Sequence, residues 1–288
     1  MFSIHKVLCA AGVLLSVMGS SARAAEPLPD SLKVGEFIIG CQAWTFNRFT
    51  TFEAIEKTRA AGGKVIEMYP GQKMSAEDPV GVGPDMSAAQ VQKLKNKLAQ
   101  EGIKAVAFGV TGISKDENDS RKLFAWAKDM DIRLINTESA DAIDNIEKMV
   151  KEFDIKVGFH DHPRRANDPN YRMWDPLYIR DLVKDRDARI GACADTGHWV
   201  RSGLNPVYCL KILKGRIMGS HLKDLHVFEE GGHDMPYGMG VSDVPGILNE
   251  FKRQGFIGPI SVEYEHKQEN NLPEVTQSIA FVRDYKTK

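Results

Sequence analysis

Two periodicities alternate along the chain from residue 37 onward. Short runs rich in β-branched and aromatic residues predict strands, and longer stretches with apolar residues every three or four positions predict amphipathic helices. The predicted strands cover residues 37–44, 64–70, 104–110, 133–138, 156–162, 189–195, 216–224 and 258–265. The predicted helices cover residues 51–62, 87–102, 119–130, 143–153, 175–185, 205–215, 243–255 and 272–285.

This alternation of strands and helices predicts the fold. Short apolar strands separated by helices are typical of a parallel sheet. Eight such repeats indicate an α/β protein with a single closed (β/α)₈ barrel, or TIM barrel, over residues 37–288 and an N-terminal extension at residues 25–36. The alternative is an open doubly wound sheet, but no Gly-x-Gly-x-x-Gly turn follows the first predicted strand.

The N-terminus has the features of an export signal. Lys6 precedes an apolar stretch over residues 7–18, and Ala22-Arg23-Ala24 fits a small-x-small cleavage site. The apolar stretch is shorter than the roughly 20 residues needed to span a bilayer. Residues 1–24 therefore predict a cleaved signal peptide, a periplasmic or secreted location, and no membrane association after cleavage.

The composition of the mature chain narrows the classes of partner. Removing residues 1–24 leaves 36 basic against 39 acidic residues, a net charge of −3. A chain without a basic block is a poor match for nucleic acid or anionic membranes. The remaining cysteines, Cys41, Cys193 and Cys209, are too few and odd in number for a disulfide framework. The sequence leaves open whether the chain forms a homo-oligomer.

Carboxylate and imidazole groups stand at the ends of the last five predicted strands. These groups are Glu138; His160 with Asp161 and His162; Asp195 with His198; His221 with Lys223 and Asp224; and Glu263 with Glu265. In a TIM barrel the chemistry lies at the C-terminal ends of the strands, and these are the groups that bind divalent metals. Singly, Glu138 fits a helix charge partner, Asp195 a helix cap and His221 a core histidine. Together they predict a metal site.

The Asp195-Thr196-Gly197 tripeptide raises the alternative of an aspartic protease. Such enzymes need two carboxylates that share a proton, usually from two such loops in a β-rich chain. This chain has one Asp-Thr-Gly in an alternating α/β pattern. The protease interpretation is therefore rejected.

Several motifs in the second half of the chain resemble a known family. They are Asp195-Thr-Gly-His198, Ser220-His221-Leu-Lys-Asp224, Pro236-Tyr-Gly238-Met-Gly240 with Val241-Ser-Asp243, and Gly255-Phe-Ile-Gly258-Pro-Ile-Ser-Val-Glu263. The chain resembles the xylose isomerase-like TIM barrels, which include sugar isomerases and epimerases, inosose dehydratase and type IV apurinic endonucleases. The resemblance covers roughly residues 37 to 285.

The resemblance implies a divalent ion, Mn, Mg, Co or Zn, held by Asp195, His221, Glu263 and one further ligand. In many members the further ligand is a glutamate that ends strand five. Here strand five ends in Phe159-His160-Asp161-His162, which looks like the inosose dehydratase-type branch. Glu138 and His160 both remain candidates; Glu138 is favoured, with His160 left as an acid or base.

The endonuclease branch does not fit this chain. It needs additional histidines from strands two and three, whose ends here read Glu67-Met-Tyr69 and Gly109-Val-Thr111. The export signal and the net charge also argue against a role in DNA repair.

The chemistry that suits such a site is proton transfer next to a carbonyl, through an enediolate stabilised by a divalent ion. The predicted function is a metal-dependent isomerase or epimerase of a free or keto sugar. The alternatives are a dehydratase or lyase on a keto-sugar, inosose or 3-keto-glycoside, and a non-catalytic sugar-binding subunit. Export favours free over phosphorylated sugars.

Each site residue has an expected role. Glu263 with Glu138 or His160 is the expected acid/base pair, and Asp224 an outer partner of Lys223 or His221. The expected substrate contacts are His162, His198, Lys223 and Trp199. Aromatic residues near the mouth, whose alternative role is loop packing, are Trp44, Phe46, Tyr69, Trp174, Trp199 and Tyr237. The loops at 164–174 and 228–241 are long for this fold and are expected to cover the pocket.

Overall fold

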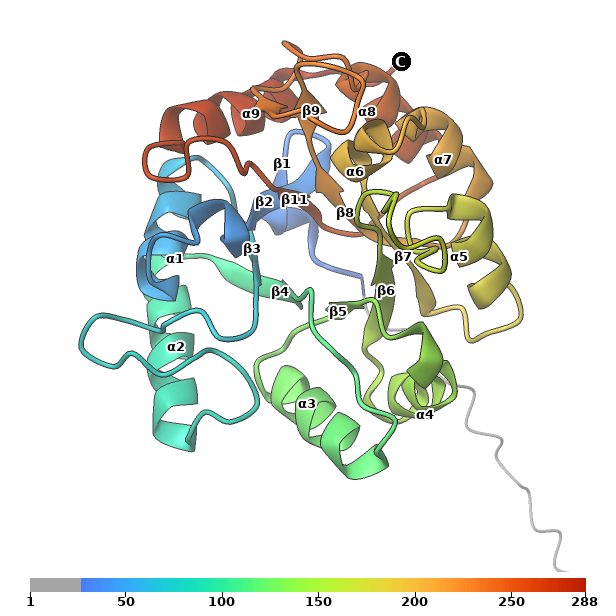
Figure 1. Cartoon of the computed structure of the whole chain (residues 1–288). Helices are drawn as coiled ribbons and strands as arrows, with labels where there is room; N and C mark the ends of the chain where they lie inside the picture. Colours follow the sequence, from blue (N-terminus) through green and yellow to red (C-terminus); the bar gives the residue numbers. More distant parts are fainter. Residues whose placement is uncertain (1–26) are drawn as a thin grey trace, which may run out of the picture.

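The computed structural model describes residues 27–288, so the predicted signal peptide lies outside the described residues. Eight parallel strands close into a barrel surrounded by helices (Figure 1). The strands are β2 (Phe37–Gln42), β3 (Val65–Met68), β4 (Lys104–Phe108), β5 (Leu134–Thr137), β6 (Lys156–His160), β7 (Ile190–Asp195), β8 (Ile217–Leu222) and β11 (Ile260–Val262). Pairing of β2 with both β11 and β3 closes the barrel, and the predicted single-domain (β/α)₈ fold is confirmed.

Among residues 27–288, eight helices follow the predicted order, and a ninth, the short helix α6, was not predicted. They are α1 (Thr51–Ala60), α2 (Ala88–Glu101), α3 (Glu117–Asp129), α4 (Ile143–Phe153), α5 (Pro176–Val183), α6 (Thr196–Arg201), α7 (Pro206–Ile212), α8 (Val244–Arg253) and α9 (Leu272–Asp284). Ser87 caps α2 in a capping box with Gln90, and Gly102 ends it at φ 65°. No helix within residues 27–288 is long and apolar enough to cross a membrane.

Three short 3₁₀ helices and three short strands complete the fold. The 3₁₀ helices are η1 (Asp30–Leu32), η2 (Ala43–Phe46) and η3 (Ala140–Ala142). Strand β1 (Lys33–Val34) pairs antiparallel with β2, within the expected N-terminal extension. Strands β9 (Asp224–Leu225) and β10 (Asp234–Met235) form a small hairpin, of which only β10 lies within the loop at 228–241 that was expected to cover the pocket.

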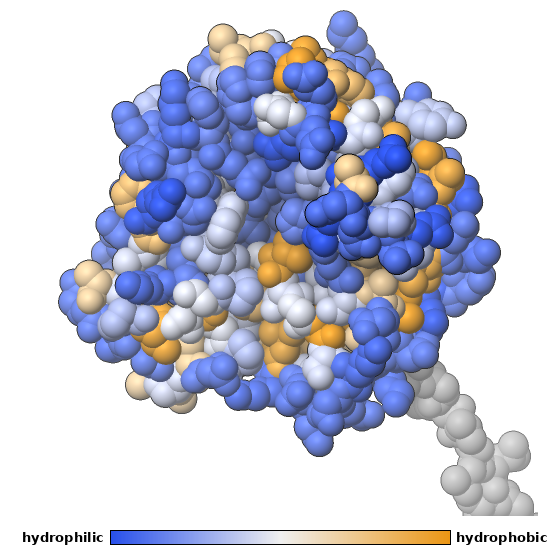
Figure 2. Space-filling view, in the orientation of Figure 1, coloured by the Kyte–Doolittle hydropathy of each residue, from blue (hydrophilic) through white to orange (hydrophobic). Residues whose placement is uncertain are grey.

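Most strands end earlier than predicted. Strand β5 stops at Thr137 instead of residue 138, β8 at Leu222 instead of 224, and β11 at Val262 instead of 265. The polar residues that follow leave the hydrogen-bonded ladder at the C-terminal mouth of the barrel. Figure 2, in the same orientation as Figure 1, shows that hydrophilic residues dominate this face.

The barrel strands are buried on both faces and pack without room for extra atoms at two glycines. A Cβ on Gly40 would lie 1.6 Å from the carbonyl oxygen of Val65, and one on Gly191 would lie 2.0 Å from that of Arg216. These glycines let neighbouring strands approach closely.

An ion pair between Arg189 and Asp187, just before β7, makes the free energy of unfolding depend on pH. Arg189 donates from Nε to Asp187 Oδ1 at 2.9 Å and from Nη2 to Oδ2 at 2.8 Å. These hydrogen bonds lower the pKa of Asp187 from 3.8 to about 2. A carboxylate with a depressed pKa stabilises the folded state above its unfolded pKa and loses that contribution as the pH falls through the folded value.

We therefore expect Asp187→Asn to lower the free energy of unfolding by about 1 kcal/mol at pH 7. The difference from wild type should shrink below pH 3.8 and vanish near pH 2. Urea unfolding at a series of pH values measures this difference. Asp181→Asn is the matched control, because Asp181 pairs with its neighbour Arg180 and its side chain is 54% exposed. The prediction would be contradicted if both variants lost the same free energy of unfolding at every pH.

Candidate metal centre and substrate cavity

Four buried side chains from four neighbouring strands converge at the C-terminal mouth of the barrel. His160 ends β6, Asp195 ends β7, His221 lies on β8, and Glu263 directly follows β11. One donor atom from each lies within 4.8 Å of the others. His160 Nε2 is 3.6 Å from Asp195 Oδ2, and His221 Nδ1 is 3.3 Å from Glu263 Oε2.

The donor atoms of this cluster fit a divalent metal ion. His160 Nε2, Asp195 Oδ2 and His221 Nδ1 are buried and have no hydrogen-bond partner among residues 27–288. Buried polar atoms are nearly always paired in folded proteins. Imidazole nitrogen and carboxylate oxygen are common ligands of divalent metals. The predicted site is therefore assembled in three dimensions, as a cluster that can hold a metal ion.

Glu138 lies behind His160, outside the four-residue cluster. Its Oε1 is 3.7 Å from His160 Nδ1, contacts His162 Nδ1 and accepts a hydrogen bond from the Tyr171 hydroxyl at 3.0 Å. Burial alone would raise the pKa of Glu138, but the two histidines outweigh it and hold that pKa well below its usual range. The geometry favours His160 over Glu138 as the fourth ligand, the reverse of the preference drawn from the sequence.

Lys223 is fully buried beside the cluster. Its Nζ lies 3.2 Å from Asp195 Oδ2, 2.8 Å from Glu263 Oε2 and 2.8 Å from Glu265 Oε2. Burial alone would lower the pKa of Lys223, but these carboxylates hold it well above its ordinary value. A Cβ on Gly197 would lie 2.7 Å from the Lys223 side chain, so the glycine of the Asp-Thr-Gly-His motif makes room for the lysine.

His198 is held as a neutral imidazole. Burial, together with the nearby charges of Lys223, His160 and Arg201, lowers its pKa well below the ordinary value. Arg201 Nη1 lies 3.1 Å from His198 Nδ1 and has only hydrogens to offer, so Nδ1 is the acceptor and the proton sits on Nε2. His198 therefore presents an N–H donor, which fits its expected contact with a substrate oxygen.

Two expected roles are corrected by the structure. Trp199 is 1% exposed and belongs to the hydrophobic core, because its neighbour His198 takes the cavity-facing side of α6. Within residues 27–288, the Asp224 carboxylate forms no hydrogen bond or ion pair with the Lys223 or His221 side chain. Its carboxylate accepts backbone hydrogen bonds from Gly238, Gly240 and Ser242 at 2.9–3.0 Å, and so holds the loop that follows β10.

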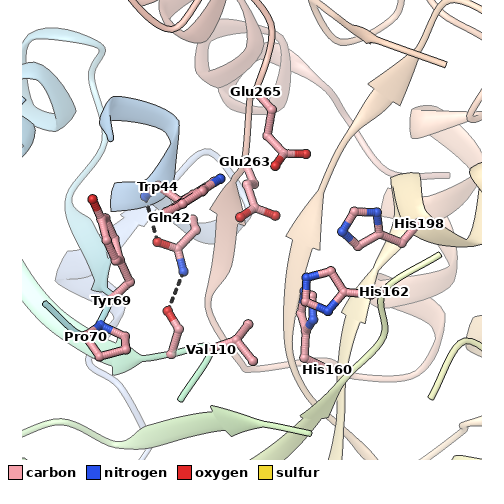
Figure 3. A pocket seen from close by; sticks show the side chains of 11 residues that line it. Gln42, Trp44, Tyr69, Pro70, Val110, His160, His162, His198, Glu263 and Glu265 are labelled. Atoms are coloured by element: carbon pink, nitrogen blue, oxygen red, sulfur yellow. Dashed lines mark hydrogen bonds between the residues drawn. The ribbon is translucent and has the colours of Figure 1, made fainter. Parts of the chain in front are cut away.

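The cluster opens into a cavity of about 390 Å³. Figure 3 shows Trp44, Tyr69 and Pro70 on one side and the three histidines on the other, with Glu263 and Glu265 between them. The lining residues are Gln42, Trp44, Tyr69, Pro70, Gly109, Val110, His160, His162, His198, Glu263 and Glu265. Trp44 and Tyr69 meet edge to face at 5.1 Å between ring centroids, whereas Phe46 and Tyr237 are buried in the core.

Both long loops reach the site. Tyr171, from the loop at 164–174, donates to Glu138 and accepts from the backbone N–H of His162. In the loop at 228–241, Gly232 accepts from Arg201 Nε at 3.0 Å, and Asp234 accepts from the backbone N–H of Glu265 at 3.0 Å. The loops therefore contact residues of the site, but neither contributes a residue to the lining of the cavity, and their role as a cover stays a prediction.

The sequence reasoning missed one residue beneath the cluster. Glu67, on β3, is 2% exposed and lies 3.0 Å from His221 Nε2. The only signal in the sequence was a charged residue within the apolar run VIEM.

The fold and the four-residue cluster define a TIM barrel with a candidate divalent-metal centre at the C-terminal ends of its strands. The family model described as xylose isomerase-like TIM barrel matches residues 55–285, and the chain belongs to this family. None of the curated proteins matches the chain.

Similar solved structures give the same fold. An uncharacterised protein from Parabacteroides distasonis is 32% identical with a TM-score of 0.67, over 85% of this chain and 97% of the other. A D-psicose 3-epimerase with D-tagatose from Clostridium cellulolyticum is 13% identical, with a TM-score of 0.65. The match covers 85% of this chain and 98% of the other. A probable 3-DHS dehydratase involved in petrobactin synthesis from Bacillus anthracis is 14% identical, with a TM-score of 0.60. The match covers 85% of this chain and 98% of the other. At the two lower identities the likeness shows the fold and not the reaction.

Proposed function

We propose that the protein is a metal-dependent isomerase or epimerase that moves a proton on a sugar carbon next to a carbonyl. The observation that carries this proposal is the buried cluster of His160, Asp195, His221 and Glu263 at the base of the cavity. Membership of a family whose structural neighbours include epimerases supports the sugar substrate. A bound divalent ion would polarise the substrate carbonyl and so acidify the neighbouring carbon.

The cavity lining favours a neutral sugar over a sugar phosphate. Within the described part of the chain, none of the eleven lining residues is a lysine or an arginine, and two are glutamates. The nearby cations are already paired: Lys223 with Glu263 and Glu265, and Arg201 with Glu265 at 3.2 Å. A phosphate would meet acidic groups without a free partner, whereas sugar hydroxyls hydrogen-bond to carboxylates and imidazoles alike.

Two groups that line different parts of the cavity can exchange protons with the substrate. His162 lies on the histidine side, and Glu263 lies between that side and Trp44 (Figure 3). His162 is 41% exposed and its Nδ1 contacts Glu138, which does not itself line the cavity. We assign the acid/base roles to Glu263 and His162, with Glu138 orienting the imidazole. Removal of the proton at one face and its return at the other, or at the next carbon, gives epimerisation or isomerisation.

Deuterium exchange tests the proposal directly. Metal-loaded protein is incubated in D₂O with ketoses, inososes and 3-keto-glycosides, and NMR follows the carbon next to each carbonyl. Deuterium at that carbon with a rearranged sugar supports isomerase or epimerase activity. Loss of the group β to the new carbanion would instead identify a dehydratase or lyase. Binding without exchange across the panel would contradict catalysis and indicate a sugar-binding protein.

The donor set also predicts which metals support activity. Two imidazole nitrogens and two carboxylate oxygens favour Mn²⁺, Co²⁺ or Zn²⁺ over Mg²⁺ and Ca²⁺, which prefer all-oxygen sites. After the metal is removed by chelation, we expect Mn²⁺, Co²⁺ or Zn²⁺ to restore deuterium exchange. Mg²⁺ should restore less than about a tenth of that exchange. His160→Glu replaces one nitrogen by oxygen and should raise the relative activity with Mg²⁺. Equal restoration of the wild type by Mg²⁺ and Zn²⁺ would contradict this donor set.

A further inference from the structure

Glu67 is a carboxylate in the interior of the barrel, below the metal-binding cluster. It lies on β3 and is 2% exposed. Within residues 27–288, the only ionisable group of opposite charge in ion-pair range of it is His221. A buried carboxylate that pairs with a single histidine is costly to keep in a barrel core unless it does something for that histidine.

The contacts of Glu67 come from three other barrel strands. Asn136 Nδ2 on β5 donates to its Oε1 at 2.7 Å, and the Ser261 hydroxyl on β11 donates to its Oε2 at 2.9 Å. His221 Nε2 on β8 lies 3.0 Å from the same Oε1 that Asn136 approaches. Asn136 and Ser261 therefore fix the carboxylate so that one oxygen faces the His221 ring.

The two nitrogens of His221 face opposite ways. Nε2 faces Glu67, whereas Nδ1 faces the cluster, 3.3 Å from Glu263 Oε2 and 3.9 Å from Asp195 Oδ2. A neutral imidazole carries its proton on one nitrogen, and the other nitrogen has the free lone pair. Nε2 and Glu67 Oε1 are in ion-pair range but are not aligned as a hydrogen bond. The carboxylate charge beside Nε2 favours a proton on that nitrogen, which leaves the Nδ1 lone pair available to a metal ion.

We propose that Glu67 is a positioning residue that holds His221 as the tautomer protonated on Nε2 and so presents Nδ1 to the metal centre. This inference rests on the metal-binding role assigned to the cluster, but not on the reaction. Carboxylates that hold the outer nitrogen of a ligating histidine typically change metal affinity 10- to 100-fold. The alternative is that Glu67 only fills and cross-links the barrel core.

Three variants separate these roles. Glu67→Leu removes the acceptor for Nε2 and should weaken Zn²⁺ and Co²⁺ binding by the metal-free protein about 10- to 100-fold. Glu67→Gln keeps a carbonyl acceptor without the charge and should restore part of that loss. Ser261→Ala removes only the hydrogen bond to Glu67 Oε2 and leaves Asn136 on Oε1, the oxygen beside His221. It should lower the unfolding temperature but change metal affinity less than about 3-fold.

The protonated nitrogen of His221 gives a readout that does not depend on substrate. In long-range ¹H–¹⁵N NMR spectra of Zn²⁺-loaded protein with ¹⁵N-labelled histidine, wild-type His221 should carry its proton on Nε2 and bind the ion through Nδ1, whereas Glu67→Leu should show a mixture of the two arrangements. A wild-type proton on Nδ1 would overturn the proposal. It would also be overturned if, in all three variants, the loss of metal affinity were simply proportional to the drop in unfolding temperature. If Glu67→Leu does not fold, the wild-type tautomer and Glu67→Gln still decide. Failure of the sugar exchange test would leave these results untouched.

Discussion

Replacement of Asp195 by alanine is expected to abolish metal retention and proton exchange together. Asp195 Oδ2 lies 3.6 Å from His160 Nε2, 3.9 Å from His221 Nδ1 and 3.2 Å from Lys223 Nζ. Its loss removes one ligand and leaves the Lys223 ammonium beside the two histidines with less opposing charge. We expect metal affinity to fall more than about 100-fold and exchange to fall more than about 1,000-fold. Metal content after dialysis and deuterium incorporation measure the two effects.

Asp195→Asn is the matched variant for this test. Asp195 Oδ1 also caps α6 by accepting from the backbone N–H of His198 at 2.8 Å, a contact whose loss costs about 1 kcal/mol. An asparagine keeps the capping oxygen and replaces the other by an amide nitrogen, which does not bind metal. Asp195→Asn should therefore lose the metal and the exchange while keeping the cap. Full exchange by metal-free Asp195→Ala would contradict the role of the cluster.

His162→Gln is expected to reduce exchange by about 1,000-fold while the protein keeps its metal. His162 lines the cavity but is not one of the four clustered groups. Glutamine fills similar space and forms hydrogen bonds, but it does not exchange protons in the physiological range. Metal content and deuterium incorporation, measured on the same sample, separate binding from proton transfer.

Tyr171→Phe controls for disturbance of the group behind His162. It removes one hydrogen bond to Glu138 and leaves the contact between Glu138 and His162 in place. We expect less than about a 10-fold loss of exchange. If His162→Gln exchanges as fast as Tyr171→Phe, His162 is a binding residue and Glu263 acts without a partner on that side.

The barrel and most of its site were predictable because strand ends and chain order determine them. Eight strand–helix repeats place the last residues of each strand at one mouth, whatever the loops do. This reasoning brought Asp195, His221 and Glu263 together. It did not resolve Glu138 against His160. His160 is still inside β6, where alternation turns it inward, but Glu138 is one residue past the end of β5, where alternation no longer applies.

Two of the errors share a physical cause, which is short structure inside loops. Trp199 was expected to contact the substrate as an aromatic residue near the mouth, but the six-residue helix α6 turns it into the core. Asp224 was expected beside Lys223, but it begins the β9–β10 hairpin and binds the backbone of the loop beyond. Glu67 needed partners from β5, β8 and β11, which no local pattern reveals.

The Lys223 ammonium has a consequence for how the protein is assembled. It already offsets part of the charge of Asp195 and Glu263, the two acidic members of the cluster, before any ion binds. Small zinc domains unfold without their metal, but here the charge that would oppose folding is compensated from within. We therefore expect the chelated protein to unfold in one cooperative transition. Its unfolding temperature, measured by circular dichroism, should lie within about 5 °C of that of the metal-loaded protein in dilute metal. The chain can then complete its fold first and acquire its ion afterwards, in whatever compartment supplies it.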